Sequence, residues 1–244
     1  MAAKDTQYTQ VHLLEKRKPR KRLGRHVLHD ERSRNFRAVG PRGVVRQSAP
    51  IGSATHTIPG GVLDQGNLGS CTGNATAYLA RFYQGSATGL GERTAVKIYE
   101  LASRLDGVPG AYPPNDTGSD GLSALKAALE LRHLPRGAKY RWCFGLDDVL
   151  RVVSNHGPVI IGISWYSGMD SPDRNGLVKP TGTVRGGHEV CVYGLEWSGK
   201  PTTSYVNVMQ SWGSSWGLHG RFRLRVPDLG KLLKHDGDAA CIAP

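Results

Sequence analysis

The sequence predicts an α+β protein, because helical periodicity fills the first half of the folded region and strand-like runs fill the second. Apolar residues recur at helical spacing over about 72–83, 94–105, a segment that starts near 120, and 146–155. Strand-like runs follow at 158–165, 189–193, 204–209 and 220–224. Helices followed by strands favour two lobes, a helical lobe over about 51–155 and a β lobe over about 156–244, with a cleft between them.

Each predicted helix has its own signal. In the first, Ala75, Tyr78, Leu79 and Phe82 form one apolar face. The second ends before the loop at 109–116, which is rich in proline. Either Asp120 or Ser123 can cap the third, and the fourth is short.

The strands are predicted by runs of apolar and β-branched residues. Residues 158–165 form an almost unbroken apolar run, which is typical of a buried strand. The three later runs are shorter and contain valine, tyrosine or phenylalanine. No internal repeat is evident.

Composition favours a protein of the cytoplasm. The 244 residues are 39% hydrophobic, and no apolar run approaches the roughly 20 residues of a membrane span. Residues 1–5 lack the apolar segment of a secretory signal. We expect a cytoplasmic location without a signal peptide, or a virion-associated one if a phage encodes the chain.

The charge of +12 lies mostly at the amino end. Residues 1–50 contain 13 Lys+Arg and 4 Asp+Glu, a net of +9, and 16–22 hold six cations in seven positions. Breaker clusters at 40–43 and 48–52 predict that the folded domain, 51–244, begins near residue 50. We expect 1–50 to be a basic, flexible arm. Residues 16–25 could bind a polyanion such as nucleic acid or an acidic protein, and a cleavable pro-segment is a further alternative.

Four cysteines, at 71, 143, 191 and 241, are widely separated. This spacing predicts neither a zinc site nor a disulfide framework. Cys71 differs from the others because it follows Gly69-Ser70 at the start of the first predicted helix. A helix amino terminus lowers a thiol pKa, and the thiolate is the nucleophilic form.

A cysteine nucleophile needs a base and a group that orients the base. Among nine histidines, His188 alone follows two glycines at the start of a predicted strand, where its side chain can reach a cleft. Gln210 stands before 211–217, a segment with two tryptophans four residues apart. Its amide oxygen can accept a hydrogen bond from the imidazole, and a tryptophan can exclude water from that bond.

In this order, the blocks 65–71, 187–188 and 211–217 resemble the papain-like cysteine peptidases over about residues 54–226. Weaker marks are the glycine loop 117–121 and the strand entry 156–159. The Gly-Ser-Cys-Thr-Gly-Asn run is similar to the bacterial and phage branch. The resemblance implies a papain-like fold, with a central helix that carries the nucleophile and a β-barrel-like second lobe.

The resemblance also implies a site without metal or organic cofactor. Cys71 is the expected nucleophile, His188 the base, paired with it as thiolate and imidazolium, and Gln210 the orienting residue. The expected oxyanion hole comprises the Gln65 amide and the Cys71 N–H, and Trp212 is the expected shield. Peptide or protein substrate is expected to lie against the following residues: Gly69, Ser70, Asp120, Gly121 and Gly187.

Two departures from the family pattern leave alternatives open. Glutamine replaces asparagine at 210, so its oxygen reaches the imidazole only if the longer side chain folds back. Thr72 replaces an aromatic residue after the cysteine. Besides a peptidase that acts through an acyl-enzyme, the sequence allows a weak or inactive structural or virion-associated module that docks through the basic arm, or other acyl-transfer chemistry. Glu189 is expected on the strand face opposite His188, without a catalytic role.

Overall fold

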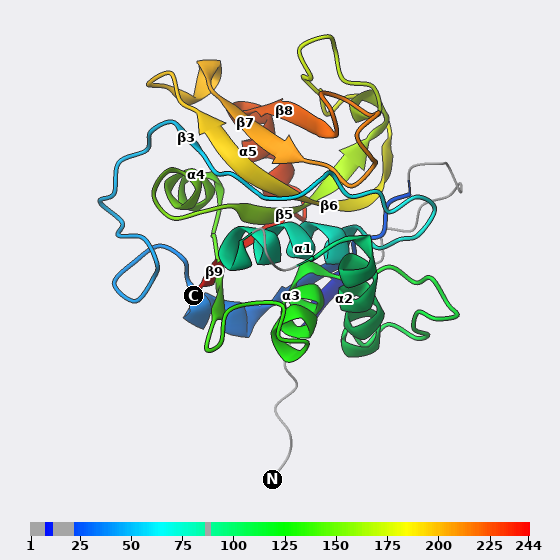
Figure 1. Cartoon of the computed structure of the whole chain (residues 1–244). Coiled ribbons are helices and arrows are strands. Elements are labelled where there is room, and N and C mark those ends of the chain that lie inside the picture. Colours follow the sequence, from blue (N-terminus) through cyan, green and yellow to red (C-terminus); the bar gives the residue numbers. More distant parts are fainter. Residues whose placement is uncertain (1–7, 12–21, 86–88) are drawn as a thin grey trace.

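The computed structural model describes residues 8–11, 22–85 and 89–244, and the chain folds as helices packed against an antiparallel sheet. The helical part comprises α1 (Cys71–Gln84), α2 (Glu92–Leu105) and α3 (Gly121–Glu130). Figure 1 shows α1 across the middle of the molecule, between the sheet above it and α2 and α3 below it. The predicted first three helices are therefore present, with α1 longer by one residue at each end and α2 beginning two residues earlier than expected.

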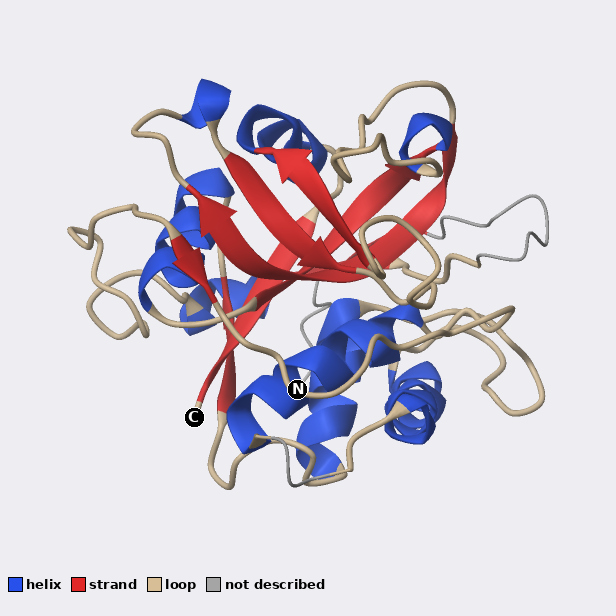
Figure 2. Ribbon diagram, turned by 45° about the horizontal axis from the view of Figure 1, so that its top comes forward, coloured by secondary structure: helices blue, strands red, loops and turns tan. Residues whose placement is uncertain are grey.

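The sheet has seven strands, and every pair in it is antiparallel. The bounds are β3 (Ala54–Thr55), β4 (Lys139–Trp142), β5 (Val159–Tyr166), β6 (Val184–Glu196), β7 (Tyr205–Met209), β8 (Arg221–Arg225) and β9 (Asp238–Ala243). The strand order is β4-β9-β5-β6-β7-β8, and β3 pairs with β6. The sheet forms a single twisted layer that does not close (Figure 2), so the expected barrel-like lobe is an open sheet.

Both faces of the sheet are buried, which explains the unbroken apolar run in β5. Ile160 and Cys191 pack with α1, α2 and α3, whereas Ile161 and Val190 pack in a second core. That second core includes side chains from α4 (Leu146–Asn155) and α5 (Val226–Lys234). The bounds of α4 agree with the predicted 146–155, and α5 and β9 were not predicted.

The region before residue 50 is more folded than expected. β1 (Tyr8–Val11) pairs with β2 (Val27–Asp30), and a short 3-10 helix, η1, follows over Glu31–Phe36. Leu23, Val39 and Val45 are buried in the hydrophobic cores. The folded part thus extends well before the expected boundary at 50, because apolar side chains between the arginines enter the core. Residues 16–21, the centre of the expected flexible arm, lie outside the described residues.

Two further short 3-10 helices are present in the described part of the chain. η3 spans Ser167–Met169 and η4 spans Pro201–Thr203. Asp120 caps α3, since its side chain accepts a hydrogen bond from the Ser123 N–H. The structure thereby selects Asp120 from the two predicted caps. No described helix has the length and apolar character needed to cross a membrane.

Candidate active site

Cys71 is the first residue of α1, as the sequence predicts, and His188 lies on β6. Both side chains are fully buried. The backbone N–H groups of Glu189 and Thr72 lie near enough to the Cys71 sulfur to favour the thiolate and oppose the rise of its pKa. Glu189 directly follows His188, and α1 packs against β6. Cys71 therefore lies next to the strand that carries His188, although the two residues are 117 positions apart in the sequence.

Gln210 holds the imidazole. Its Oε1 lies 2.6 Å from His188 Nε2 and also accepts a hydrogen bond of 2.9 Å from the Ser211 N–H. An amide oxygen can only accept, so Nε2 of His188 is the donor and carries the proton. The extra methylene of glutamine is accommodated, because the amide folds back onto its own backbone.

The second imidazole nitrogen, His188 Nδ1, is buried and makes no hydrogen bond. With the proton on Nε2, a neutral imidazole presents the lone pair of Nδ1. Such an unpaired buried acceptor is uncommon in folded proteins and needs an explanation. It is the one imidazole nitrogen that is left to accept a proton.

Three aromatic rings enclose the imidazole. Trp212 stacks on it with ring centroids 5.0 Å apart, and Trp165 meets it edge-on at 5.1 Å. Trp216 packs against both tryptophans. Of the two tryptophans in 211–217, Trp212 contacts the imidazole, and Trp216 packs behind it.

Gln65 is fixed in the loop that precedes α1. Its Oε1 accepts a hydrogen bond from the Ser211 hydroxyl at 2.6 Å, and its Nε2 donates to the Leu68 carbonyl at 2.7 Å. The amide group has two N–H donors, so one is left for another acceptor. These contacts set the orientation of the amide before any substrate arrives.

A segment from the amino end, Arg22–His26, passes between the two halves of the site. The N–H groups of Gly24 and Arg25 donate to the Gly187 carbonyl at 3.2 and 3.0 Å. On the other side, the Ser119 N–H donates to Gly24 O at 2.8 Å, and the His26 N–H donates to Ser119 O at 2.7 Å. The segment is therefore hydrogen-bonded to the glycine loop and to the residue before His188.

The contact of this segment with the loop before α1 depends on Gly24. A Cβ at this position would lie 2.1 Å from the Gly69 carbonyl oxygen, which no side chain tolerates. Farther along, Trp212 Nε1 donates to Arg22 O, and Arg22 forms an ion pair with Asp116 at 3.1 Å. Gly69 and Gly187, two of the expected substrate-contacting residues, therefore contact the chain's own amino-terminal segment.

The other expected substrate-contacting residues have mainly structural contacts. Ser70 is buried and accepts two hydrogen bonds from Asn74 Nδ2. Asp120 caps α3, and Gly121 lies against Glu189. Glu189 faces the helices, opposite His188, as expected, but there it meets a buried charge, Arg25. Sequence reasoning missed this pair. The one available signal was Gly162, a glycine inside an otherwise apolar strand.

Burial controls the protonation of both key groups. It raises the pKa of Cys71 to about 12, despite the N–H donors at its sulfur and the nearby Arg25. It lowers the pKa of His188 to about 3, although the hydrogen bond to Gln210 acts in the opposite direction. In this closed form both groups are neutral at pH 7. Both shifts favour the neutral forms while the site is closed, so the expected thiolate–imidazolium pair stays a prediction for a site that is open to water.

The arginines within 16–25 that the structure describes, Arg22 and Arg25, are paired with carboxylates of the same chain. The structure gives no support to a polyanion partner for this segment. Cys143, Cys191 and Cys241 are buried and unbridged, in keeping with the packing role expected for Cys191.

The sequence is similar to papain-family cysteine proteases and to cathepsin B-like proteins. A sequence model described as "Papain family cysteine protease" matches residues 141–230, which carry His188 and Gln210 but not Cys71. The chain is 32% identical over 101 residues to cathepsin B-like cysteine proteinase 3 of Ostertagia ostertagi, covering 41% of this chain and 56% of that protein. It is 28% identical over 200 residues to an uncharacterized peptidase C1-like protein of Acanthamoeba polyphaga mimivirus, covering 66% and 63%. The chain thus spans about three-fifths of the length of these relatives, which do not single out a bacterial or phage branch.

Solved structures show the same fold over nearly the whole chain. Xylellain, a cysteine protease from Xylella fastidiosa, aligns with a TM-score of 0.68 at 18% identity and covers 94% of this chain and 98% of its own. A procathepsin B from Trypanosoma congolense aligns with a TM-score of 0.61 at 14% identity, covering 89% and 85%. Likeness to papain-family cysteine proteases over residues 141–230, and a shared fold over nearly the whole chain, together support a papain-like cysteine peptidase.

Proposed function

We propose that this chain is a cysteine peptidase held in a latent form by its segment Arg22–His26. The observation that carries the proposal is the state of His188. Its Nε2 is hydrogen-bonded to Gln210, while Nδ1 is buried without a hydrogen bond, on the strand that lies next to the start of α1. A structural histidine would use both nitrogens, whereas a base requires one to be free.

The proposed reaction begins when the segment leaves. Water then reaches the site, the desolvation that keeps both groups neutral is relieved, and the Cys71 proton moves to His188 Nδ1. The sulfur attacks the peptide carbonyl, and the Cys71 N–H and the Gln65 amide stabilise the oxyanion. The imidazolium protonates the leaving amine. A water molecule, deprotonated by His188, then hydrolyses the acyl-enzyme and returns Cys71 to a thiol.

The latent state is supported by the hydrogen bonds of the segment. Its peptide groups bond to Ser119 on one side and to Gly187 on the other, and these are the groups that would otherwise hold a substrate backbone. A pro-segment of modest length can therefore occlude the site. Five residues suffice, because the rest of the region folds onto the body.

Hydrolysis of peptides by the full-length protein tests this proposal. We would use Gly24→Ala, whose Cβ would lie 2.1 Å from Gly69 O, to displace the segment, and measure cleavage of a fluorogenic peptide library. Adding Cys71→Ala should abolish cleavage. Cys191→Ala, at an equally buried cysteine, should retain most of it.

Two results would refute the peptidase proposal. One is cleavage that persists without Cys71. The other is a folded Gly24→Ala protein with an exposed Cys71 that cleaves no peptide of the library, since this would favour a papain-fold module without catalysis.

A further inference from the structure

Arg25 is the only basic residue of the segment Arg22–His26 whose side chain is fully buried. Its Nη2 donates to Asp238 Oδ2 at 2.5 Å and to the Asp236 carbonyl at 2.8 Å. Glu189 Oε2 lies 3.9 Å from Arg25 Nε, and neither side chain is exposed. An arginine is costly to bury, so this guanidinium occupies a site with strong negative charge.

Carboxylates outnumber the cation in this site. Glu189, Asp238 and Asp120 interact electrostatically with one another, and all three are largely buried. Burial raises the pKa of Asp120 to about 6 and also raises that of Glu189, with the neighbouring acids adding to both effects. Both Glu189 oxygens lack a hydrogen bond. A buried carboxylate without donors is poorly satisfied, and a guanidinium can supply them.

Glycines leave the room that the guanidinium fills. A Cβ at Gly162 on β5 would lie 2.4 Å from Arg25 Nε and 2.7 Å from Asp238 Oδ1. A Cβ at Gly121 would lie 2.9 Å from Glu189 Oε1. Glycine weakens a buried strand, and it is favoured where another group must approach the backbone closely. The absence of a side chain at Gly162 and Gly121 therefore leaves room for the guanidinium and for Glu189.

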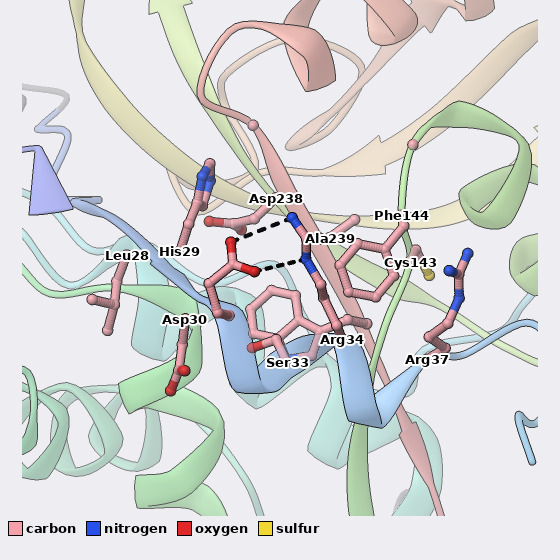
Figure 3. A pocket seen from close by; sticks show the side chains of 14 residues that line it. Leu28, His29, Asp30, Ser33, Arg34, Arg37, Cys143, Phe144, Asp238 and Ala239 are labelled. Carbon is pink, nitrogen blue, oxygen red and sulfur yellow. Dashed lines mark hydrogen bonds and ion pairs between the residues drawn. The ribbon is translucent and has the colours of Figure 1, made fainter. Parts of the chain in front are cut away.

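The acidic site adjoins the proposed nucleophile. The Glu189 N–H lies near the Cys71 sulfur, and the Arg25 N–H bonds to Gly187, the residue before His188. On the other side, Asp238 lines an open pocket of about 390 Å³ (Figure 3). The close-up shows Asp238 and Ala239 near Arg34 and Phe144 among the residues that line this pocket.

We propose that Glu189, Asp238 and Asp120 form a specificity pocket for an arginine side chain of the substrate, and that Arg25 fills this pocket in the closed form. The inference rests on the proposed peptidase function and adds the substrate class. A peptide that runs between Ser119 and Gly187 places one side chain in the pocket. An arginine places a cation among the carboxylates, as Arg25 does, leucine leaves them without one, and glutamate adds a like charge.

Ligand binding tests the pocket without reference to catalysis. In full-length Arg25→Gln the guanidinium is absent, so N-acetyl-arginine methylamide should bind and raise the melting temperature in a dose-dependent way. The norleucine analogue should not. Wild type, whose pocket is filled, should show no shift with either. Arg25→Lys, which retains a charge, is a second variant in case Arg25→Gln is too unstable to assay.

Catalysis tests the substrate class. The substrates are peptides in which each position before the cleaved bond carries arginine, leucine or glutamate in turn. With the Arg25→Gln enzyme, we expect kcat/KM at one of these positions to be about tenfold higher for arginine than for leucine or glutamate. Adding Glu189→Gln or Asp238→Asn should reduce that preference. Glu196→Gln is the matched control, because Glu196 lies on the same strand but is exposed and pairs with Arg223.

The outcomes separate the two proposals. Cleavage without a preference for arginine at any position, together with equal binding of both methylamides, would overturn the pocket while leaving the peptidase intact. Selective binding of the arginine compound by a protein that cleaves no peptide would support the pocket and refute the peptidase. A preference that Glu196→Gln abolishes as strongly as Glu189→Gln would also contradict the assignment.

Discussion

The orienting residue Gln210 shows how far a single position can depart from a family pattern. Its amide reaches the imidazole at 2.6 Å because the Ser211 N–H holds the same oxygen. The local backbone therefore fixes the longer side chain in a position that the sequence left uncertain. His188 in this arrangement has one defined tautomer.

Loss of this amide should impair catalysis more than binding. We expect Gln210→Ala, in the Gly24→Ala background, to lower kcat by roughly 10²-fold, at the low end of general acid–base contributions, with little change in KM. The imidazole would then sample both tautomers and other ring orientations. Steady-state kinetics measures the effect, and Gln84→Ala, at the partly exposed end of α1, is the control.

A Gln210→Ala protein with unchanged kcat would show that the orientation comes from the tryptophans alone. Such a result would remove Gln210 from the site. It would leave the proposed roles of Cys71 and His188 in place.

At this scale, the sequence predicted the residues that stand in ordered motifs and missed those that do not. Cys71, His188 and Gln210 each stand next to glycine or tryptophan signals. Arg25 and Asp238 are 213 positions apart and have no local pattern. Their pairing arises only when β9 lies beside β5, so no inspection of either neighbourhood could reveal it.

Among the secondary-structure elements, too, those with a strong local pattern were predicted and those with a weak one were missed. The helix α4 has strong periodicity, so its bounds were predicted as 146–155. The strand β9, Asp238–Ala243, consists largely of alanine and has little intrinsic strand preference, yet it pairs with both β4 and β5. Tertiary pairing overrides weak propensity there. The prediction of a flexible arm up to residue 50 overlooked the apolar residues between the charged ones, of which Leu23, Val39 and Val45 enter the core.

Adding one methyl group, in the variant Gly24→Ala, should displace the segment Arg22–His26 from the site. In Gly24→Ala the new Cβ would overlap Gly69 O, and both are backbone-bound groups that cannot rotate away. The N–H groups of Gly24 and Arg25 donate to Gly187 O, and the Ser119 N–H donates to Gly24 O. We expect these three amides to exchange hydrogen for deuterium faster in Gly24→Ala than in wild type.

The matched control is Gly52→Ala. No heavy atom lies within 4 Å of a Cβ at this position, so exchange should remain as in wild type. Protection of 24–25 and Ser119 that is the same in Gly24→Ala and Gly52→Ala would contradict the close packing of the segment.

In the whole molecule, the amino-terminal region has two roles, and the sequence analysis distinguished neither of them. Its apolar side chains join the body of the protein, and its segment Arg22–His26 crosses the site and fills an acidic pocket. The net +9 of residues 1–50 suggested an external anion. Arg22 and Arg25 of this region are instead paired with the carboxylates Asp116 and Asp238 of the same chain.

This arrangement couples opening of the segment to the chemistry of the site. Burial accounts for the raised pKa of Cys71 and the lowered pKa of His188. Exposure to water moves the two values toward each other, which favours transfer of the proton from sulfur to imidazole. Opening would therefore create both access and nucleophilicity in one step.

The most direct test is the rate at which iodoacetamide alkylates Cys71 across pH, with the labelled cysteine located by mass spectrometry. We expect slow labelling of wild type throughout pH 5–8, because the thiol is buried and protonated. In Gly24→Ala we expect rapid, selective labelling of Cys71 well below pH 8, and loss of that low-pH reactivity on adding His188→Ala. Labelling of Cys71 in Gly24→Ala that is no faster than that of Cys143, Cys191 and Cys241 would contradict the central claim.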